Sequence, residues 1–387
     1  MHVVCPQDQL RRAITVVSRA VPSRTVLPSL GHVLLEASGG RLRLTATNLE
    51  IGITRWVDAD VRKEGAVTVP SKLLNDIVGS LPSAPITMTL DARTHIVHLT
   101  CAHFEIRLNG AEAAIFPHPP RIDSDSSVVH LPASMLRESI TQVAYAASTD
   151  DIRPVLQGVH LRFHAANVML RAADGFRMAQ QTITLPEPVE PERSVLIPAR
   201  ALAELARILD DDATVALLMP SGGEHVVFDA GDTLLSSRVI HGTFPDVDKV
   251  IPSHYRTRAI IERDALSKAV KLASFFADAS SHVALLHIVP ADAPGAGQIV
   301  VSANAAEVGD NTGWVEATIQ GDETRIALNV RLLADAIAAI ASQHVVLDIQ
   351  SPNAPVVLRP DEQSTTMHLI MPMVIHSSHT LHHETSS

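Results

Sequence analysis

The chain has 387 residues and a formal net charge of −11 at pH 7, and 46% of its residues are hydrophobic, 19% charged and 3% aromatic. These values are typical of well-packed globular protein, with two to four domains at roughly 100–200 residues each. The longest nearly apolar run, Leu332 to Ala341, contains Asp335 and is far shorter than the ~20 residues of a membrane-spanning helix. A helical membrane protein is therefore excluded.

The N-terminal residues include no basic segment followed by an apolar one, so we expect no secretory signal. Cys5 and Cys101 lie 96 residues apart and form no CxxC pattern. Two unclustered cysteines are typical of a reducing compartment. We therefore expect a cytoplasmic protein in which both cysteines are small core residues.

Two helical patterns recur three times along the chain. Their reference positions are Leu10, Leu136 and Leu266 for the first helix, and Pro70, Pro198 and Asn329 for the second. The spacings are 126 and 130 residues for the first helix and 128 and 131 for the second. The second pattern carries apolar residues at i, i+3, i+4 and i+7, which predicts a helix with one buried stripe.

Short strands with alternating apolar residues separate the helices. Examples are HVLLEA from His32, ITMTL from Ile86, IVHLT from Ile96, VVFDA from Val226 and VVLDI from Val345. A further repeated pattern is a strand that enters a turn centred on Asn48, Asp174 or Asn304, since Asn and Asp bond their own backbone in turns. One-sided strands and helices predict antiparallel sheets covered by helices on one face, an α+β fold.

A period of this length is that of a full domain, because solenoid units repeat every 20–50 residues. Polar stretches with proline begin at Phe116 and Phe244. We therefore expect domains at about 1–124, 125–253 and 254–375. The histidine-rich tail, 376–387, is polar and unpatterned, so we expect it to be disordered and without a specific metal site.

The repeated helices are more basic than the rest of the chain. They hold ten basic and six acidic side chains, a net charge of +4 in a chain of −11. The basic residues are Arg11, Arg12, Arg19, Lys72, Arg137, Arg200, Arg207, Lys268, Lys271 and Arg331. No base-reading motif accompanies them, so they indicate either solvated helix faces or sequence-independent contact with a polyanion.

Six separated motifs give the chain a family resemblance. They are RTVLPSLGHVLLEA from Arg24, LTATNLEIGI from Leu44, TVPSKLL from Thr68, ADGFRMA from Ala173, HGTFPDVDKVIP from His241 and LIMPM from Leu369. In order and spacing they resemble the bacterial DNA polymerase III β subunit, the sliding clamp family, over about 1–375. The resemblance implies three clamp domains per chain, with helices lining the inside and antiparallel sheets outside. Two chains would form a head-to-tail homodimeric ring around double-stranded DNA.

The resemblance also implies the function. The ring would be a processivity factor in DNA replication that tethers the replicative polymerase, the clamp loader and repair proteins through short peptides. It would be a non-catalytic subunit of a DNA polymerase III holoenzyme, with no catalytic site, cofactor, metal or membrane contact.

The implied site residues fall into three groups. The peptide pocket would comprise Leu156, Ala173, Gly175, Phe176, Arg177, Met178, Pro245, Lys249, Val250, Pro355, Leu369, Met371, Pro372 and Met373, with Arg177 and Lys249 bordering it. DNA would face Arg24 and Arg153 together with the helix residues Arg11, Arg12, Lys72, Arg137, Arg200, Arg207, Lys268, Lys271 and Arg331. The ring joint would bring Phe104 and Ile106 of one chain to Phe275 and Phe276 of the other.

Four positions depart from common family residues. Ala173 replaces Thr, Phe176 replaces His or Tyr, and Val374 replaces Arg, which leads to the hypothesis that the pocket prefers more apolar peptides. Asp150 stands where a neutral polar contact to DNA is common, which argues against DNA contact by this loop.

Two other classes of protein stay open at this stage. An enzyme would need a catalytic constellation, and no GxxxxGK, GxSxG or HExxH motif is present, although scattered histidines could still meet in space. A repeat-built scaffold that binds only proteins would share the pocket and lack the ring.

Overall fold

The structure, a computed structural model, describes residues 1–24, 27–119, 127–219, 223–277, 282–293, 295–361 and 364–373. Val374 and the tail 376–387 lie outside these ranges. Helices occur at the six predicted places, namely α1 (Gln7–Val17), α2 (Ser71–Ser80), α3 (Ala133–Val143), α4 (Ala199–Ile208), α5 (Arg263–Ser274) and α6 (Val330–Ala339). None of the described helices is long and apolar enough to span a membrane.

Strands fill the intervals between the helices, as the alternating segments predicted. Up to residue 132 they are β1 (His2–Pro6), β2 (His32–Ser38), β3 (Arg41–Thr47), β4 (Ile51–Asp58), β5 (Asp60–Lys63), β6 (Gly65–Pro70), β7 (Pro85–Asp91), β8 (Ile96–Cys101), β9 (Phe104–Asn109) and β10 (Ser127–Pro132). The next are β11 (Gly158–Ala173), β12 (Arg177–Pro198), β13 (Thr214–Met219), β14 (His225–Asp229) and β15 (Thr233–Arg238). The last are β16 (Thr257–Glu262), β17 (Val283–Pro290), β18 (Ala296–Ala305), β19 (Gly309–Gly321), β20 (Thr324–Asn329), β21 (His344–Ile349), β22 (Val356–Pro360) and β23 (Met367–Ile370).

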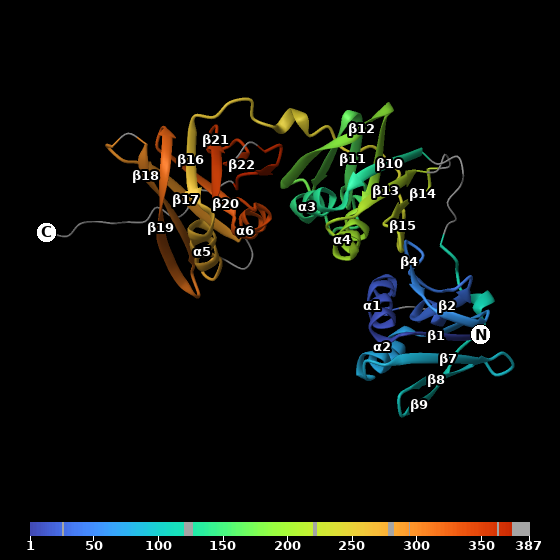
Figure 1. Ribbon diagram of the computed structural model, residues 1–387. Coiled ribbons are helices and arrows are strands. Elements are labelled where there is room, and N and C mark those ends of the chain that lie inside the picture. Colours follow the sequence, from blue (N-terminus) through green and yellow to red (C-terminus); the bar gives the residue numbers. More distant parts are fainter. Residues whose placement is uncertain are drawn as a thin grey trace. The chain divides into compact units, whose positions relative to one another are not determined.

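The strands form three sheets, and this confirms the α+β prediction. Their orders are β5-β1-β7-β8-β9, β10-β13-β14-β15-β4-β3-β2-β6 and β11-β12-β23-β22-β21-β16-β19-β18-β17-β20. Figure 1 labels the helices and most of the strands. By its contacts the chain divides into two compact units. The first comprises residues 1–138, 163–167 and 184–241, and the second comprises 139–162, 168–183 and 242–387.

The helix starts follow from local chemistry. Pro70 and Pro198 occupy the N-cap positions of α2 and α4, with ψ of 118° and 128°, and precede the first helical residue. At α6 the Asn329 side chain does the capping, because its Oδ1 accepts the N–H groups of Arg331 and Leu332 at 3.0 and 3.3 Å.

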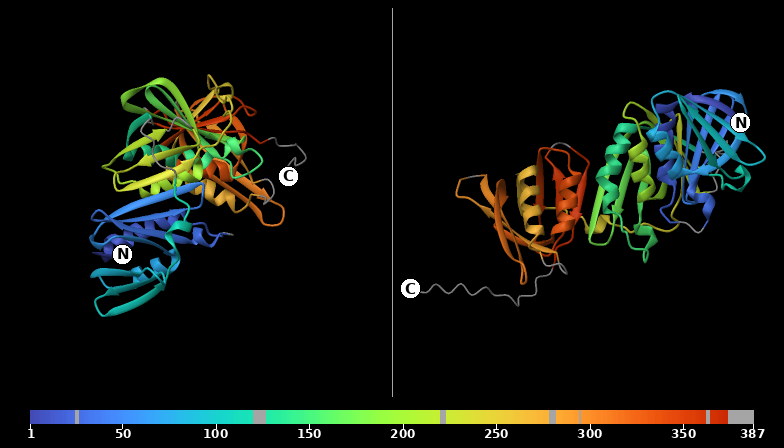
Figure 2. Two further views of the ribbon diagram at one scale, coloured as in Figure 1. Left: turned by 90° about the vertical axis from the view of Figure 1, so that its right-hand side faces the viewer. Right: turned by 90° about the horizontal axis from the view of Figure 1, so that it is seen from below.

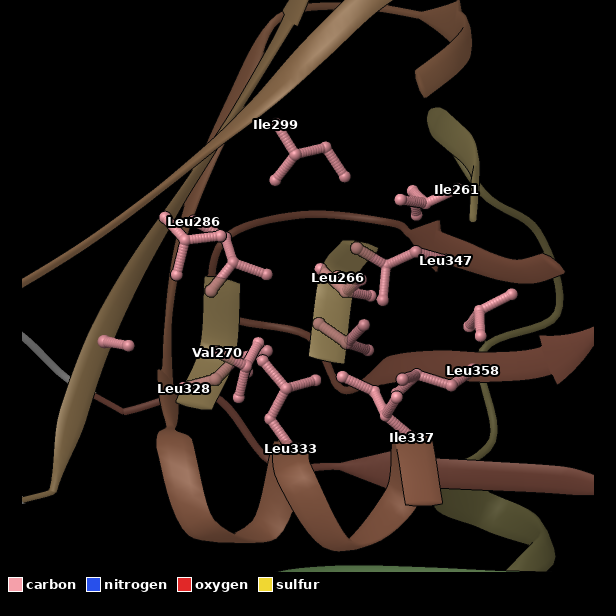
Figure 3. Close-up of a cluster of buried hydrophobic side chains, with 14 of the residues drawn as sticks. Ile261, Leu266, Val270, Leu286, Ile299, Leu328, Leu333, Ile337, Leu347 and Leu358 are labelled. Atoms are coloured by element: carbon pink, nitrogen blue, oxygen red, sulfur yellow. The ribbon is translucent and has the colours of Figure 1, made fainter. Parts of the chain in front are cut away.

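Within the second unit, α5 and α6 lie side by side against the strands that surround them (Figure 2). Figure 3 shows the core between them, where Leu266 of α5 and Leu333 of α6 point toward sheet residues such as Leu347 and Leu358. All four are fully buried. The core is aliphatic, as the low aromatic content requires.

The two cysteines are free and buried, as predicted. Burial raises the pKa of the Cys5 thiol to about 12, so this side chain stays uncharged and acts as a small core residue.

One predicted turn is wrong. Asn48 and Asp174 do lie in turns, but Asn304 lies within β18 opposite Asp310 of β19. The β18–β19 ladder has ten residue pairs and continues to Ala305 and Gly309, so the chain reverses after residue 305. Backbone pairing along a long hairpin outweighs the local preference of one asparagine for a turn.

Candidate functional site

An apolar cluster lies where the ends of two antiparallel strands meet. Met178 of β12 is opposite Leu369 of β23, and each is only 2% exposed. Together with Ala173 and Val247 they form a buried cluster, which we call the apolar floor. Further side chains pack against it, namely Phe244, Ile251, Met367 and Met371.

The turn before β12 presents an aromatic side chain beside this floor. Asp174 Oδ1 accepts the N–H groups of Phe176 and Arg177 at 2.8 and 2.9 Å, which closes the turn. Gly175 occupies it with φ of +96°, a conformation that glycine adopts at little cost. Phe176 is 62% exposed, and its carbonyl oxygen accepts the Met371 N–H at 2.8 Å. The turn and the last strand therefore hold each other in place.

Arg177 is held by two carboxylates and a ring. Its Nε donates to Asp174 Oδ2 at 3.0 Å and its Nη1 to Asp335 Oδ2 at 2.6 Å, while Cζ lies 5.1 Å from the centre of the Tyr145 ring. The side chain is 13% exposed. Arg177 thus fixes the turn to α6, whereas the family resemblance placed it at the pocket border.

A buried polar pair lies beneath the same strand. The Tyr145 hydroxyl and His368 Nδ1 are 2.9 Å apart, and His368 is fully buried. Burial lowers the pKa of His368 to about 4 and raises that of Tyr145 above its usual value, so both groups are neutral near pH 7. His368 Nε2 has no hydrogen-bond partner among the described residues.

The linker that precedes the last repeat covers one side of the apolar floor. Asp248 accepts two hydrogen bonds from Arg171, which lower the pKa of its carboxyl group. Phe244 stacks on His160, with ring centres 5.3 Å apart. These contacts fix the linker so that Val247 reaches the apolar floor.

Exposed residues that the resemblance assigns to the pocket lie on the same linker. Lys249 pairs with Asp246 at 3.1 Å, and both side chains are exposed. Pro245 and Val250 are also exposed. These three predicted residues therefore remain accessible to a ligand.

The structure sorts the other predicted pocket residues. Ala173, Gly175, Phe176, Met178, Leu369 and Met371 come together at the floor or its turn. Among the described residues Leu156, Pro355, Pro372 and Met373 are not part of the packed cluster. Sequence reasoning missed Phe244, Val247, Ile251 and Met367. Met367 could have been found, because it lies two residues before Leu369 and alternation puts both on one face.

The proposed DNA-facing cations differ in their pairing. Within the described ranges no ion pair engages the exposed side chains of Arg11, Arg12, Lys72, Arg200, Lys268, Lys271 and Arg331, which we call the free helix cations. Arg137 pairs with Asp211 at 2.5 Å and Arg207 with Glu204 at 2.7 Å.

Two arginines lie differently from the sequence-based count. Arg19 lies beyond α1 and Arg263 begins α5, so the helices still hold ten basic and six acidic residues. Arg24 is exposed. Arg153 Nη2 lies 3.4 Å from the position that a Cβ on Gly175 would occupy, so Arg153 lies against the pocket turn.

Two open stretches of strand lie near the predicted joint residues or in the same sheet as them, one in each unit. Strand β9 has β8 as its single neighbour, and its first residue, Phe104, is 54% exposed while Ile106 is half-buried. In β19 the described pairs on the β16 side involve only Ala317 to Gly321, so the first part of the strand is open on that side.

The predicted joint residues of the second unit lie at the end of α5. Phe275 is 61% exposed, whereas Phe276 packs against the core. Phe275 is therefore exposed for contact with another molecule, whereas Phe276 packs against the core behind it. Within the described ranges no group of three His, Cys, Asp or Glu residues could hold a metal ion.

Repeated α+β units with cationic helices, and an apolar cluster beside the last strand, are the arrangement that the family resemblance implies. Family models described as the N-terminal, central and C-terminal domains of the DNA polymerase III beta subunit match residues 1–120, 130–246 and 248–374. The chain therefore belongs to the DNA polymerase III β subunit family.

Curated relatives and solved structures agree with this assignment. The chain is 32% identical to a beta sliding clamp of Synechocystis, over 96% of this chain and 99% of the relative. It is 33% identical to that of Synechococcus elongatus, over 97% of this chain and all of the relative. The crystal structure of the DNA polymerase sliding clamp from Bacillus subtilis matches with a TM-score of 0.89 at 26% identity, covering 97% of this chain and 100% of that one.

Proposed function

We propose that this chain is a sliding clamp, in which two copies close head to tail around duplex DNA and tether partner proteins through the pocket. The observation that carries the proposal is the set of seven free helix cations, which are exposed and have no ion pair within the described ranges, in a chain with a net charge of −11. Diffuse positive charge attracts phosphates without reading bases, so DNA is retained by encirclement and can still slide.

The open edges support ring closure. Strand β9 and the first part of β19 each offer unpaired backbone groups, and an isolated chain that exposed them would risk aggregation. Pairing one with the other in a second copy is a heterologous contact, which closes when the rotation permits. Phe104 and Phe275 would then be covered.

The division into domains at about 1–124, 125–253 and 254–375 is part of this proposal, supported by the threefold order of helices and strands. As a member of its family the chain is a processivity subunit without a catalytic site. We also infer a cytoplasmic location, which the two free cysteines support.

The ring can be tested on DNA. We expect a native mass of two chains and a protein that is retained on nicked circular duplex DNA and lost when the circle is cut. Phe104→Asp with Phe275→Asp should give monomers that leave both DNAs at one rate. Wild-type protein that leaves circular and linear DNA equally fast would contradict the clamp and favour the scaffold.

The pocket would bind a short apolar segment of a partner. The exposed Phe176 ring supports the hypothesis of a more apolar preference, to which Ala173 also contributes, while Val374 lies outside the described residues. The wild type should bind a peptide with an aliphatic anchor more tightly than one with a polar anchor. In Phe176→His this difference in affinity should be smaller. Equal discrimination by both proteins would overturn the hypothesis.

A further inference from the structure

We propose that the sheet face beside the pocket is a second contact surface, where Arg258 and Arg359 receive a carboxylate from residues that flank the pocket-bound part of a partner peptide. The proposal rests on the peptide-binding function of the pocket and adds that the bound peptide carries a negative charge beside its apolar anchor. It commits to an acidic flanking segment as the occupant of this face.

The strand register places the two arginines on the face of the apolar floor. Met178 is opposite Leu369, Leu369 is opposite Val357, Val357 is opposite Asp348, and Asp348 is opposite Arg258. Directly opposed residues on neighbouring strands project from the same face. One row of side chains therefore runs across β12, β23, β22, β21 and β16 from the pocket to the arginine.

The neighbouring row brings the second arginine to the same place. Arg359 of β22 is opposite Val346 of β21, and Met367, which packs against the apolar floor, is opposite Gln180. Arg359 lies two residues after Val357, so both side chains project from one face of β22. The new surface is therefore continuous with the pocket.

The cluster is built around one nearly buried carboxylate. Asp348 accepts from Arg258 Nε at 2.6 Å and from Arg258 Nη2 at 3.1 Å, and a second guanidinium, that of Arg359, contacts the same carboxylate. The Tyr255 ring lies 3.9 Å from Arg258 Cζ and holds that guanidinium from the other side. These contacts fix both arginines before any ligand arrives.

Two guanidinium groups share one carboxylate, which leaves a net positive charge of one in the cluster. Arg258 Nη1 and Arg359 Nη1 have no partner among the described residues; Arg359 Nε has none either, but it is buried. Guanidinium groups bind carboxylates through their N–H donors, so the two Nη1 groups match an aspartate or glutamate.

Two nearby carboxylates have neighbours of their own. Arg256 donates to Asp322 at 2.8 Å, and His344 Nδ1 lies 3.2 Å from Asp361. The spare donors of Arg258 and Arg359 therefore distinguish this cluster from the cations and acids around it.

The distances suit a short extended peptide. Neighbouring strands lie about 4.8 Å apart, so the three steps from Leu369 to Arg258 span about 14 Å. An extended chain advances about 3.3 Å per residue, so a carboxylate about two to four residues beyond the apolar anchor reaches the arginines. Only the flank that leaves the pocket toward β22 can do so.

The test is a titration with labelled peptides that share a Leu-Leu-Phe anchor. One series has glutamate about three residues before the anchor, one has it about three residues after, and each has a matched glutamine peptide. In one of the two series we expect the glutamate peptide to bind wild-type protein about five- to tenfold more tightly at low salt. High salt should reduce the ratio toward one.

Three variants sharpen the result. Arg359→Gln should lose most of the glutamate preference and keep its affinity for the glutamine peptide. Asp348→Asn should increase the preference, because both guanidinium groups lose their internal partner. Arg256→Gln is the matched control and should leave the preference unchanged.

Failure of the acidic contact can be distinguished from failure of the pocket. If glutamate and glutamine peptides bind equally, or if Arg359→Gln keeps the preference, the acidic contact is overturned and the pocket stands. If no peptide binds the wild-type protein, the pocket function fails and the acidic contact fails with it.

Discussion

The cations on the strands and the cations on the helices of the second unit are arranged in opposite ways. Arg177 bonds two carboxylates, Arg258 bonds one carboxylate with two nitrogens, and each guanidinium lies against a tyrosine ring. Lys268 and Lys271 on α5 are exposed and have no ion pair among the described residues. Fixed guanidinium groups offer defined donors for recognition, whereas free ammonium groups offer a diffuse field that salt screens.

The largest expected effect lies beneath the fixed Arg177, at His368. An unfolded chain binds a proton on this histidine with a pKa near 6.5, but the folded protein does so only at about 4. Unfolded protein therefore takes up more protons between these values, and stability falls as pH drops through this window, by up to about 3 kcal/mol.

Denaturant unfolding of the wild type and His368→Gln from pH 7 to pH 4.5 measures this contribution. The wild type should lose more stability than the variant over that range. Tyr145→Phe, which keeps the histidine buried, should keep the pH slope. If His368→Gln loses as much stability with falling pH as the wild type, the pH dependence comes from carboxylates elsewhere and not from His368.

The next effect compares one fixed cation with one free cation. Arg177→Ala removes hydrogen bonds to two carboxylates and should cost about 2 kcal/mol of stability. Lys268→Ala on an exposed helix face should stay within about 0.5 kcal/mol of the wild type. Urea unfolding of both variants tests the contrast, and equal losses would erase it. Arg177→Lys should recover little, because an ammonium group cannot replace the guanidinium fork.

Substitutions of the free lysines on α5 should have the smallest effect on stability and a clear effect on the salt dependence of DNA binding. Lys268→Gln and Lys271→Gln should each lower the slope of log affinity against log salt by about one while stability is unchanged. DNA binding at several salt concentrations provides the measurement. Arg207→Gln is the paired control and should change the slope less, because Glu204, which also pairs with Arg19, neutralises part of this charge. An equal change in all three variants would show that pairing does not matter.

Patterns local in sequence were predicted well from the sequence. The six helices follow from apolar residues at helical spacing. Met178 and Leu369, which are opposite each other in the sheet, were placed together by the family resemblance and not by a local pattern. Periodicity reports which face of an element is apolar.

Contacts distant in sequence were not predicted. Arg177 and Asp335 are 158 residues apart, and no local pattern reports that an arginine near a pocket is already neutralised. The linker residue Val247 was missed because its burial depends on Arg171 and Asp248, which pin the linker from a distant strand. Asn304 shows the reverse error, where a local preference was read as a turn.

Asp335 is a carboxylate that two arginines can compete for. It lies four residues after Arg331 on α6, a spacing at which opposite charges pair, yet its oxygen is occupied by Arg177. Because Asp335 is paired with Arg177 on the strand, it does not neutralise Arg331 on the helix. Removing Arg177 returns that acid to the helix, so a variant made to damage the pocket also subtracts one effective cation from α6. The double variant Arg177→Ala with Asp335→Asn removes both the arginine and the freed acid. A change in its peptide binding can therefore be measured without an accompanying change in the charge that α6 presents to DNA.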